Sequence, residues 1–308
     1  MNIGSLLNLS TKMLNSKNID TARLDSQLIL GKVLNKDKIY LIVNSNEEVE
    51  EKDKEEFLKL INKRMENMPV RYILGEVDFM GLDFYIEEGV LIPRSDTEVL
   101  VEEVLKIIDK DKELKVCDLC SGSGAIGISL AHYRKNIMVD LIDFYEKPEK
   151  ISKKNIVRNN LENKVKFIKS DLLKEPIKEL KKYDIIVSNP PYIKEDVIDT
   201  LMNDVKNYEP RTALSGGHSG LIFYERIVEE SKKALKENGI LAFEIGYDQG
   251  VSVSNIMKNS GYIDINVVKD LAGLDRVVIG RFSPWLNRKL YDIIIKCEKI
   301  NYGVITCY

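Results

Sequence analysis

The sharpest chemical signal in the chain is the segment Asn189-Pro190-Pro191-Tyr192, which directly follows the apolar run of residues 183–188. The amide oxygen of Asn189 is an uncharged hydrogen-bond acceptor, and Pro190 contributes a backbone carbonyl. Both prolines fix φ, and Pro191 has no N–H that could occupy these acceptors, so the turn holds them rigidly. Two rigid acceptors can take both hydrogens of a planar –NH2 group and orient its nitrogen toward an electrophile. Tyr192 adds a flat aromatic face for a planar substrate group.

This arrangement suits an amino group that is conjugated to a carbonyl or a ring, because such a group is a poor nucleophile that lacks alignment. Near-attack positioning lowers a barrier by about 7–11 kcal/mol in favourable cases. The chain holds two histidines, His132 and His218, so a histidine-based triad is not favoured. The alternative is a proline turn without chemistry. The segment follows a strand and lies downstream of a glycine-rich loop, and this position disfavours a turn without chemistry.

The glycine-rich loop lies between an expected strand over residues 114–119 and an expected helix over residues 125–132. It consists of Cys120, Ser121, Gly122, Ser123 and Gly124. Its glycines let the backbone approach a ligand closely, and exposed N–H groups at the start of the helix suit a polar or anionic ligand group. No Lys-Ser or Lys-Thr pair follows the glycines, which argues against a phosphate-binding P-loop. A tight turn without a ligand is the alternative.

The next expected strand, over residues 137–143, ends in Asp143. A carboxylate in this position can accept hydrogen bonds from both hydroxyls of a ribose, whereas the alternative is an ordinary residue of the turn after the strand. Residues 118–124 have the sequence Asp-Leu-Cys-Ser-Gly-Ser-Gly, which resembles motif I of the class I S-adenosylmethionine (SAM) methyltransferases. Because the sulfonium of SAM is already activated, we expect neither a metal ion nor a covalent enzyme intermediate.

Apolar runs and helical patterns alternate along the chain from residue 114 onward. The expected strands cover residues 114–119, 137–143, 165–169, 183–188 and 240–245, and the helices between them include residues 125–132, 149–159 and 221–235. Two later runs, residues 263–269 and 276–281, are expected to pair antiparallel at one edge. This alternation of strands and helices predicts the α/β class, with a Rossmann-like, mostly parallel sheet that is covered on both faces and has one antiparallel edge strand. A small N-terminal helical domain is expected to precede it.

Changes in composition divide the chain into four parts. Residues 1–68 are polar and helical, residues 69–90 form a hairpin linker, residues 91–282 form the sheet-containing domain, and residues 283–308 are a C-terminal extension of unknown role. In the first part, a helix over residues 21–34 places Leu24, Leu28 and Leu34 near one face, which Ile29 and Val33 widen. The hairpin is expected to span residues 70–86, and Ser95 or Asp96 can cap the helix that follows.

Length and composition are those of an ordinary globular protein of about two domains. The 308 residues carry a formal net charge of −3. Proteins that bind duplex nucleic acid usually carry a clear basic surplus, so we expect no direct binding of nucleic acid. The sequence shows no long apolar stretch and does not read as beginning with a secretory signal, so no membrane span is expected. Its four cysteines are too few and too scattered for a disulfide framework, so we expect a cytoplasmic, reduced protein. Cys117 and Cys120 form a lone C-x-x-C pair, for which neither zinc nor redox chemistry is expected.

The chain resembles the peptide chain release factor glutamine methyltransferases, the PrmC/HemK family, over roughly residues 20–282. The segments that carry the resemblance are Arg64 with residues 69–75, residues 91–98, the glycine-rich loop, residues 189–192, residues 208–214 and residues 270–280. The Asn-Pro-Pro-Tyr segment alone is shared with DNA and RNA amino-methyltransferases, whereas the order of all these segments is far more specific. Residues 143–148 are an unusual sequence variant of the family's second SAM motif.

The resemblance implies a helical domain that docks the release factor and a catalytic domain that uses SAM as methyl donor. The implied substrate is the glutamine of the Gly-Gly-Gln loop in class-1 release factors, methylated on its side-chain amide nitrogen (N5). Residues 120–124 would line the methionine part of SAM, Asp143 would hold its ribose, and Leu172 would lie near its adenine. Asn189, Pro190, Pro191 and Tyr192 would hold the glutamine amide, with Asn189 also beside SAM.

Two other functions are compatible with parts of the sequence. A nucleic-acid amino-methyltransferase that acts on adenine or a similar base would need base flipping and a basic channel, which the net charge of −3 disfavours. A non-catalytic SAM-binding module is disfavoured by the intact segment of residues 189–192. Methyl incorporation into DNA or RNA, instead of into a Gly-Gly-Gln protein, would identify the first alternative.

Overall fold

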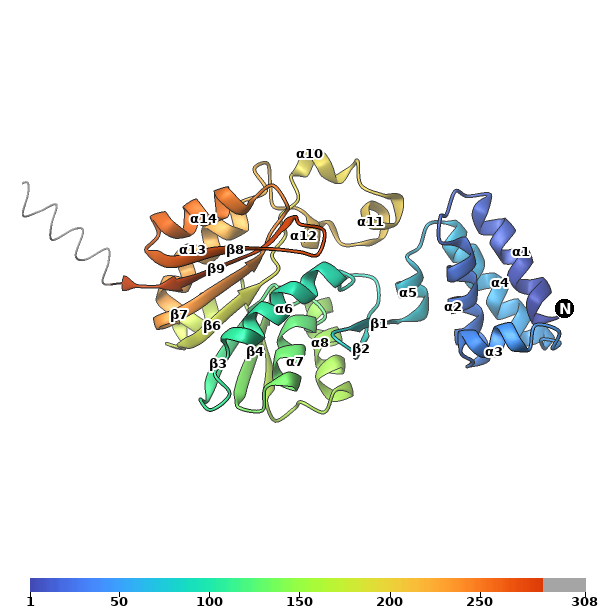
Figure 1. Cartoon of the computed structure of the whole chain (residues 1–308), viewed down its shortest axis with the longest axis horizontal. Helices are drawn as coiled ribbons and strands as arrows, with labels where there is room; N and C mark the ends of the chain where they lie inside the picture. Colours follow the sequence, from blue (N-terminus) through green and yellow to red (C-terminus); the bar gives the residue numbers. More distant parts are fainter. Residues whose placement is uncertain (285–308) are drawn as a thin grey trace, which may run out of the picture.

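The structure, a computed structural model, describes residues 1–284. Figure 1 shows a bundle of N-terminal helices beside a larger domain that is built on a twisted sheet, with a short connecting segment between them. The expected extension over residues 283–308 therefore lies almost wholly outside the described residues. None of the helices within residues 1–284 is long and apolar enough to cross a membrane.

The N-terminal bundle confirms the helical character expected for this part of the chain. Its helices are α1 (Ile3–Asn15), α2 (Ala22–Leu34), α3 (Lys38–Val43) and α4 (Glu51–Met65). Their inward faces meet in an apolar core of their own, in which Leu6, Ile29 and Phe57 are fully buried. The bundle is therefore held together by a core that is separate from the cores of the sheet domain.

The buried face of α2 agrees with the sequence-based expectation at Ile29 and differs from it at Leu24. Leu24 is 45 % exposed, whereas Asp25, Ile29 and Leu30 are buried. The cause is an ion pair across the bundle, in which Arg64 Nε donates to Asp25 Oδ2 over 2.8 Å. A buried carboxylate requires a partner of this kind. The pair brings Asp25 inward, which apolar periodicity alone does not predict.

The connecting segment begins with a helical turn where a strand was expected. Its first residues form α5 (Val70–Leu74), which ends at Gly75 with φ of 72°. The hairpin consists of β1 (Glu76–Phe79) and β2 (Leu82–Tyr85), which pair antiparallel. A glycine in the left-handed region ends a helix at little steric cost. The hairpin is therefore shorter than the predicted span of residues 70–86.

Seven strands form the central sheet within residues 1–284. They are β3 (Leu114–Leu119), β4 (Ile137–Asp143), β5 (Val165–Lys169), β6 (Tyr183–Ser188), β7 (Leu235–Glu244), β8 (Tyr262–Lys269) and β9 (Asp275–Phe282). Their order across the sheet is β5-β4-β3-β6-β7-β9-β8. The five strands from β3 to β7 run parallel, whereas β9 pairs antiparallel with both β7 and β8. The expected antiparallel pair at one edge is confirmed, with β9 inserted between β7 and the edge strand β8.

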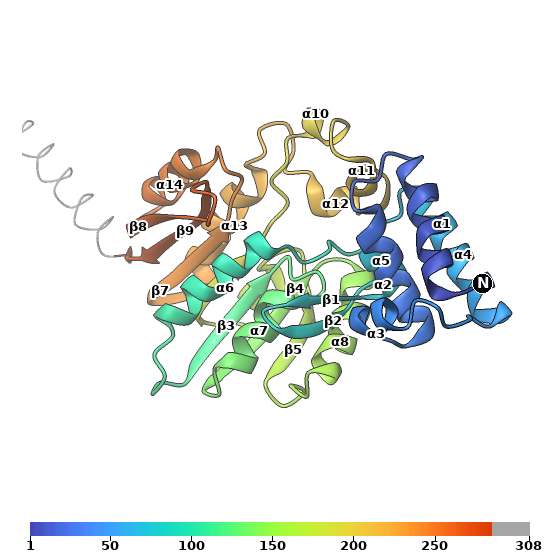
Figure 2. The ribbon, with the colours of Figure 1, turned by 45° about the vertical axis from the view of Figure 1, so that its right-hand side comes forward.

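Helices cover both faces of the sheet (Figure 2). One face carries α6 (Ser95–Ile107), α7 (Ala125–Tyr133) and α8 (Glu146–Arg158), and the other carries α13 (Ile222–Ala234) and α14 (Gly250–Asn259). Successive residues of the central strands enter opposite cores, as Val116 and Cys117 do on β3. Burial on both faces explains why these strands read as continuous apolar runs.

The start of α6 and the short helices complete this domain. The short helices are α9 (Lys174–Lys178), α10 (Glu195–Ile198), α11 (Asn203–Tyr208) and α12 (Arg211–Leu214). The N-cap of α6 is Arg94, and no side chain caps the helix, so the caps predicted at Ser95 or Asp96 are wrong. The Asp96 carboxylate instead pairs with Arg276 of β9 over 3.1 Å.

The strand order reverses between β3 and β6, because the chain moves outward from β3 to β5 and then returns to β6. In open α/β sheets, ligands bind at the carboxyl ends of the strands beside such a point. Leu119 and Ser188 are paired at the ends of β3 and β6. The glycine-rich loop and Asn189 therefore leave the sheet side by side.

Candidate active site

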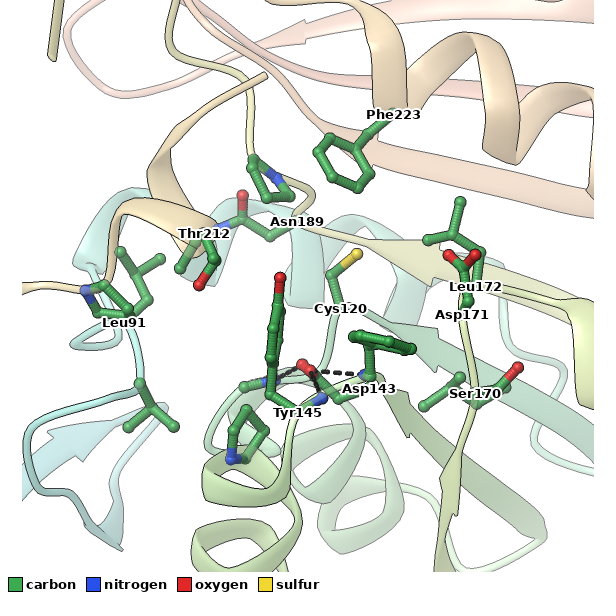
Figure 3. A pocket seen from close by; sticks show the side chains of 18 of the residues that line it. Leu91, Cys120, Asp143, Tyr145, Ser170, Asp171, Leu172, Asn189, Thr212 and Phe223 are labelled. Carbon is green, nitrogen blue, oxygen red and sulfur yellow. Dashed lines mark hydrogen bonds between the residues drawn. The ribbon is translucent and has the colours of Figure 1, made fainter. Parts of the chain in front are cut away.

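A cavity of about 280 Å³ opens at the carboxyl edge of the sheet (Figure 3). Its wall combines strand ends with segments that are distant in sequence. The strand ends contribute Cys120, Gly122, Ile142, Asp143, Ser170, Asp171, Leu172, Asn189 and Pro191, and other segments contribute Gly89, Val90, Leu91, Phe144, Tyr145, Pro148, Pro210, Thr212, Ala213, Phe223 and Arg226. Apolar and aromatic side chains predominate, with a few polar groups that can orient a ligand.

The glycine-rich loop adopts backbone conformations that favour glycine. The φ angle is 54° at Gly122 and 82° at Gly124, and Cys120 also lies in the left-handed region with φ of 57°. A Cβ on Gly122 would have no atom within 4 Å, whereas a Cβ on Gly124 would lie 2.9 Å from the side chains of Ile128 and Leu141. Gly122 thus leaves open space beside the backbone, and Gly124 permits close packing of α7.

Asp143 lies at the end of β4 and lines the cavity. Its Oδ2 accepts a hydrogen bond from the Gly122 N–H at 3.0 Å, and its Oδ1 accepts from the N–H groups of Phe144 and Tyr145 at 2.8 and 3.2 Å. Burial raises the pKa of Asp143, and these backbone donors oppose that rise. The carboxylate closes the turn and keeps further lone pairs for the hydroxyl groups of a ligand.

Asn189 follows the end of β6 and lines the same cavity. Its Nδ2 donates to Thr97 Oγ1 on α6 over 3.3 Å. This bond directs the amide nitrogen toward α6. The amide oxygen, Oδ1, lies in the same plane on the other side of Cγ and is available as an acceptor. The two strongest signals of the sequence, Asn189 and the glycine-rich loop with Asp143, therefore meet at one cavity.

Some of the residues predicted for the site are not part of the lining of this cavity. Ser121, Ser123, Gly124, Pro190 and Tyr192 are absent from the lining. Tyr192 packs against the core beneath α13, and its hydroxyl donates to Glu244 Oε1 over 3.2 Å. Its ring does not line this cavity, so an aromatic platform for the substrate at Tyr192 stays a prediction.

Leu172 lines the cavity in an uncommon backbone conformation, and its place near an adenine stays a prediction. Its φ is 51°, a value that non-glycine residues rarely adopt. The neighbouring Asp171 accepts a hydrogen bond from Arg226 at 2.7 Å, which ties the end of β5 to α13. The strained turn is thus held at the edge of the cavity by an ion pair.

Aromatic residues that the sequence analysis did not identify form much of the wall. Phe144 and Tyr145 follow Asp143, and Phe223 comes from the first turn of α13. In Figure 3 the Tyr145 side chain extends across the cavity, with Phe223 at the far side. Two consecutive aromatic residues after a strand that ends in an acidic residue are a sequence signal that could have predicted this part of the wall. Phe223 offers no such signal, because only tertiary structure brings α13 to this edge.

The outer wall is fixed by polar contacts between two loops. Arg94 pairs with Glu209, whose side chain is 1 % exposed, and the Tyr72 hydroxyl donates to the Val90 carbonyl at 2.5 Å. These contacts hold Val90 and the segment of residues 210–213 over the strand ends. The segments of residues 91–98 and 208–214, which carried part of the family resemblance, therefore have a structural role at the cavity.

The chemistry of the wall fits a nucleoside-bearing ligand. Carboxylates at Asp143 and Asp171 suit hydroxyl and amino donors, and the apolar walls suit a flat base. Arg226, the cation of the lining, is already paired with Asp171, so the cavity offers little to a phosphate. Within residues 1–284, no three side chains of His, Cys, Asp or Glu are grouped as a metal site requires. A reaction without a metal stays a prediction.

Family models match both parts of the chain. The model described as the PrmC N-terminal domain matches residues 5–75, and the model described as the methyltransferase small domain matches residues 95–207. A solved structure, the hMettl16 catalytic domain in complex with the MAT2A 3'UTR hairpin 6, covers 66 % of this chain and 76 % of its own, with a TM-score of 0.51 and 18 % identity. This last likeness shows the class of fold alone.

Curated relatives match nearly the full length of the described chain. The release factor glutamine methyltransferase of Clostridium botulinum is 49 % identical over 87 % of this chain and 95 % of its own. The protein of the same name from Clostridium acetobutylicum is 51 % identical over 83 % and 90 %. Identity at this level confirms the resemblance that the sequence motifs indicated. The chain therefore belongs to the family of release factor glutamine methyltransferases, which are enzymes.

Proposed function

We propose that this chain transfers the methyl group of SAM to the side-chain amide nitrogen (N5) of the glutamine in the Gly-Gly-Gln motif of class-1 peptide chain release factors. Relatives that match most of the chain bear the name release factor glutamine methyltransferase. The observation that carries the proposal is the presence of Asn189 and Asp143 on one cavity. The first offers an acceptor for a carboxamide, and the second offers a carboxylate for a ribose.

In this proposal the glycine-rich loop and its neighbours hold SAM, which supplies a methyl group on a sulfonium sulfur. The backbone of residues 120–124 lies along the methionine part, Asp143 accepts from the ribose hydroxyls, and Leu172 packs near the adenine. Apolar surface from Phe144 and Phe223 excludes water around the sulfonium. The support is that Cys120, Gly122, Asp143 and Leu172 line the cavity together.

The task of the Asn189 turn is to orient the glutamine carboxamide. Asn189 Oδ1 and the Pro190 carbonyl accept the two hydrogens of the –NH2 group, so that the face of the nitrogen points at the methyl carbon. As the N–C bond forms, the S–C bond breaks and its electron pair stays on sulfur, while the nitrogen releases one proton. Pro191 and Tyr192 keep the turn stiff. Alignment of this kind suits a weak nucleophile.

We also propose a division of labour along the chain. Residues 1–68 dock the release factor, residues 69–90 connect the two parts, and residues 91–282 carry out methyl transfer. A hydrogen bond from the Tyr208 hydroxyl to the Glu66 carbonyl, 2.8 Å long, links the bundle to the loop above the cavity. Because release factors act in translation, the proposal places the enzyme in the cytoplasm, with no direct part for nucleic acid, membrane or metal.

Incubation with methyl-labelled SAM and purified class-1 release factors tests the proposed function. We expect label in the release factor, and mass mapping should locate one methyl group on the glutamine of the Gly-Gly-Gln motif. A release factor with glutamate in place of that glutamine is the matched control and should stay unlabelled. Label in DNA or RNA, with none in the release factor, would instead identify an amino-methyltransferase of bases.

A further inference from the structure

A buried glutamine, Gln249, holds the last residue of the Asn-Pro-Pro-Tyr segment from outside the cavity lining. It directly precedes α14 and is 6 % exposed. Its Nε2 donates to the Tyr192 carbonyl at 3.0 Å and to the Gly220 carbonyl at 3.2 Å, and its Oε1 accepts from the Gly246 N–H at 2.9 Å. This one amide therefore joins the segment to the loop before α13 and to the turn after β7.

The orientation of the Gln249 amide follows from its backbone partners. The Gly246 N–H can only donate, so the side-chain atom that faces it must be the amide oxygen. The carbonyls of Tyr192 and Gly220 can only accept, so the atom that faces them must be the nitrogen. Both hydrogens of Nε2 are thus used, and an ionised carboxylate in the same place would present an acceptor to two acceptors. The position therefore fits glutamine and disfavours glutamate.

The peptide unit between Tyr192 and Ile193 is held on both of its sides. Its carbonyl accepts from Gln249 Nε2, and its N–H, which belongs to Ile193, donates to the Leu214 carbonyl at 2.9 Å. Gly220 permits the close approach of the loop before α13, because a Cβ there would lie 2.6 Å from the Tyr192 oxygen and 2.9 Å from Gln249 Nε2. The carboxyl end of the Asn-Pro-Pro-Tyr segment is thus fixed in direction as well as in place.

The amino end of the segment is fixed by the sheet. Ser188, the last residue of β6, pairs with Leu119 and Phe243 of the two neighbouring strands. Between the two ends, the rings of Pro190 and Pro191 fix φ at two successive residues, and neither residue has an N–H that could tie the turn. The direction of the Pro190 carbonyl therefore depends on how the two ends of the segment are held.

We propose that Gln249 is a positioning residue, which orients the acceptors of the Asn189 turn toward the carboxamide by holding the peptide unit after Tyr192. This inference rests on the proposed function and deepens it. With that peptide unit released, the Pro190 carbonyl would turn away from the –NH2 group, and the nitrogen would no longer face the methyl carbon. The hydrogen bonds of the Gln249 side chain reach none of the residues proposed to hold SAM. A change at Gln249 should therefore lower kcat and leave the affinity for SAM intact.

Two substitutions of Gln249 and one of a neighbouring residue form the test. Gln249→Glu keeps the shape and replaces the two donors with an acceptor, whereas Gln249→Met removes the donors without adding a charge. Tyr224→Phe is the matched control, because the Tyr224 hydroxyl lies 3.3 Å from Gln249 Oε1 and donates to the Glu244 carbonyl at 3.0 Å. Its loss disturbs the same buried cluster and leaves the bond from Nε2 to Tyr192 in place.

We expect Gln249→Glu to lower kcat roughly 100-fold and Gln249→Met roughly 10-fold, with SAM and the release factor both saturating. The Kd of SAM should change less than about twofold in either variant, and Tyr224→Phe should keep kcat within about threefold of the wild type. Urea unfolding followed by circular dichroism gives the stability of each variant. A kcat that falls only in proportion to stability, with Tyr224→Phe as impaired as Gln249→Met, would show that Gln249 has a merely structural role.

Hydrogen exchange at the Ile193 N–H gives a readout that is independent of turnover, since this N–H belongs to the peptide unit that Gln249 holds. Mass spectrometry of a peptide that covers residues 189–193 isolates it well, because the two prolines contribute no N–H. We expect exchange in this peptide to be at least about tenfold faster in Gln249→Glu and Gln249→Met than in the wild type and Tyr224→Phe. A peptide that covers β4 should exchange at one rate in all four proteins, which excludes global unfolding as the cause.

The outcomes separate the inference from the proposed function. Equal kcat in the wild type and Gln249→Glu would overturn the positioning role. A wild-type protein that methylates no release factor would overturn the proposed function alone. The exchange measurement would then decide the inference, which is refuted if the peptide of residues 189–193 exchanges as slowly in Gln249→Glu as in the wild type.

Discussion

Asp118 near the end of β3 is a fully buried carboxyl group, and its substitution by asparagine tests the electrostatics of the sheet edge. Its Oδ2 accepts a hydrogen bond from the Gly127 N–H at 2.9 Å, and its buried Oδ1 has no partner among the described residues. Burial raises the pKa of Asp118 to about 7, against the opposing effect of the Gly127 N–H, and the charge of Asp143 adds to the rise. Asp118→Asn keeps an acceptor for Gly127 and removes the ionisation.

The size of the effect follows from the difference in pKa between the folded and unfolded chains. The pKa of Asp118 is about 7 in the folded chain, and the pKa of an unfolded aspartate is about 3.9. Each pKa unit corresponds to about 1.4 kcal/mol, so ionisation of Asp118 lowers the free energy of unfolding by about 4 kcal/mol. Between these two pKa values the folded chain holds a proton that the unfolded chain has lost. Stability from this group therefore falls as the pH rises from about 4 to about 7, and is constant above that range.

The assay is urea unfolding of the wild type and Asp118→Asn between pH 5 and pH 8, followed by circular dichroism. Other groups titrate in both proteins, so the difference between the two unfolding free energies isolates Asp118. We expect this difference to shift in favour of the variant by roughly 3 kcal/mol from pH 5 to pH 8. A difference that is constant across this range would refute the reasoning, because it would mean that Asp118 does not titrate differently in the folded chain.

Two further predictions concern the loops of the cavity. Asn155 is fully buried and bonds both the N–H and the carbonyl of Tyr85 at 2.7 and 3.0 Å, and the Ser123 carbonyl at 2.9 Å. Asn155→Ala should therefore lower the free energy of unfolding in urea by about 3 kcal/mol, and a change under about 1 kcal/mol would show that these bonds do not join the hairpin to the glycine-rich loop. Asp143→Ala should weaken SAM binding roughly 100-fold in calorimetric titration, because it removes the acceptor for two hydroxyls; unchanged affinity would exclude a ribose at Asp143.

The strands of the sheet were predictable because burial on both faces demands unbroken apolar runs. The bounds of β3, β4, β5 and β6 agree with those expected from the sequence. The active-site edge was predictable for the same reason, since the glycine-rich loop, Asp143 and Asn189 directly follow or end these strands. Local sequence determines these positions, and the parallel sheet brings them together.

The features that the sequence did not reveal depend on contacts between distant segments. The inward side of α2 is set by Arg64, which lies 39 residues from Asp25. Phe223 reaches the cavity only because α13 packs at this edge of the sheet. The ion pair of Arg94 and Glu209 forms only because two segments that are distant in sequence meet beside the strand ends. Tyr192 was expected at the substrate because of its place in the motif, but its hydroxyl is bound to Glu244. No periodicity encodes such partners.

The central claim is that Asn189 aligns a carboxamide and does not merely support the SAM pocket. Single-turnover methyl transfer by Asn189→Ala, measured with saturating SAM and a class-1 release factor, tests it most directly. Removal of one of the two oriented acceptors should slow the methyl-transfer step by roughly 100- to 1,000-fold, while the Kd of SAM changes less than about threefold because Asp143 and the glycine-rich loop are intact. A variant that loses SAM affinity but transfers methyl groups at the wild-type rate once SAM is saturating would contradict the account.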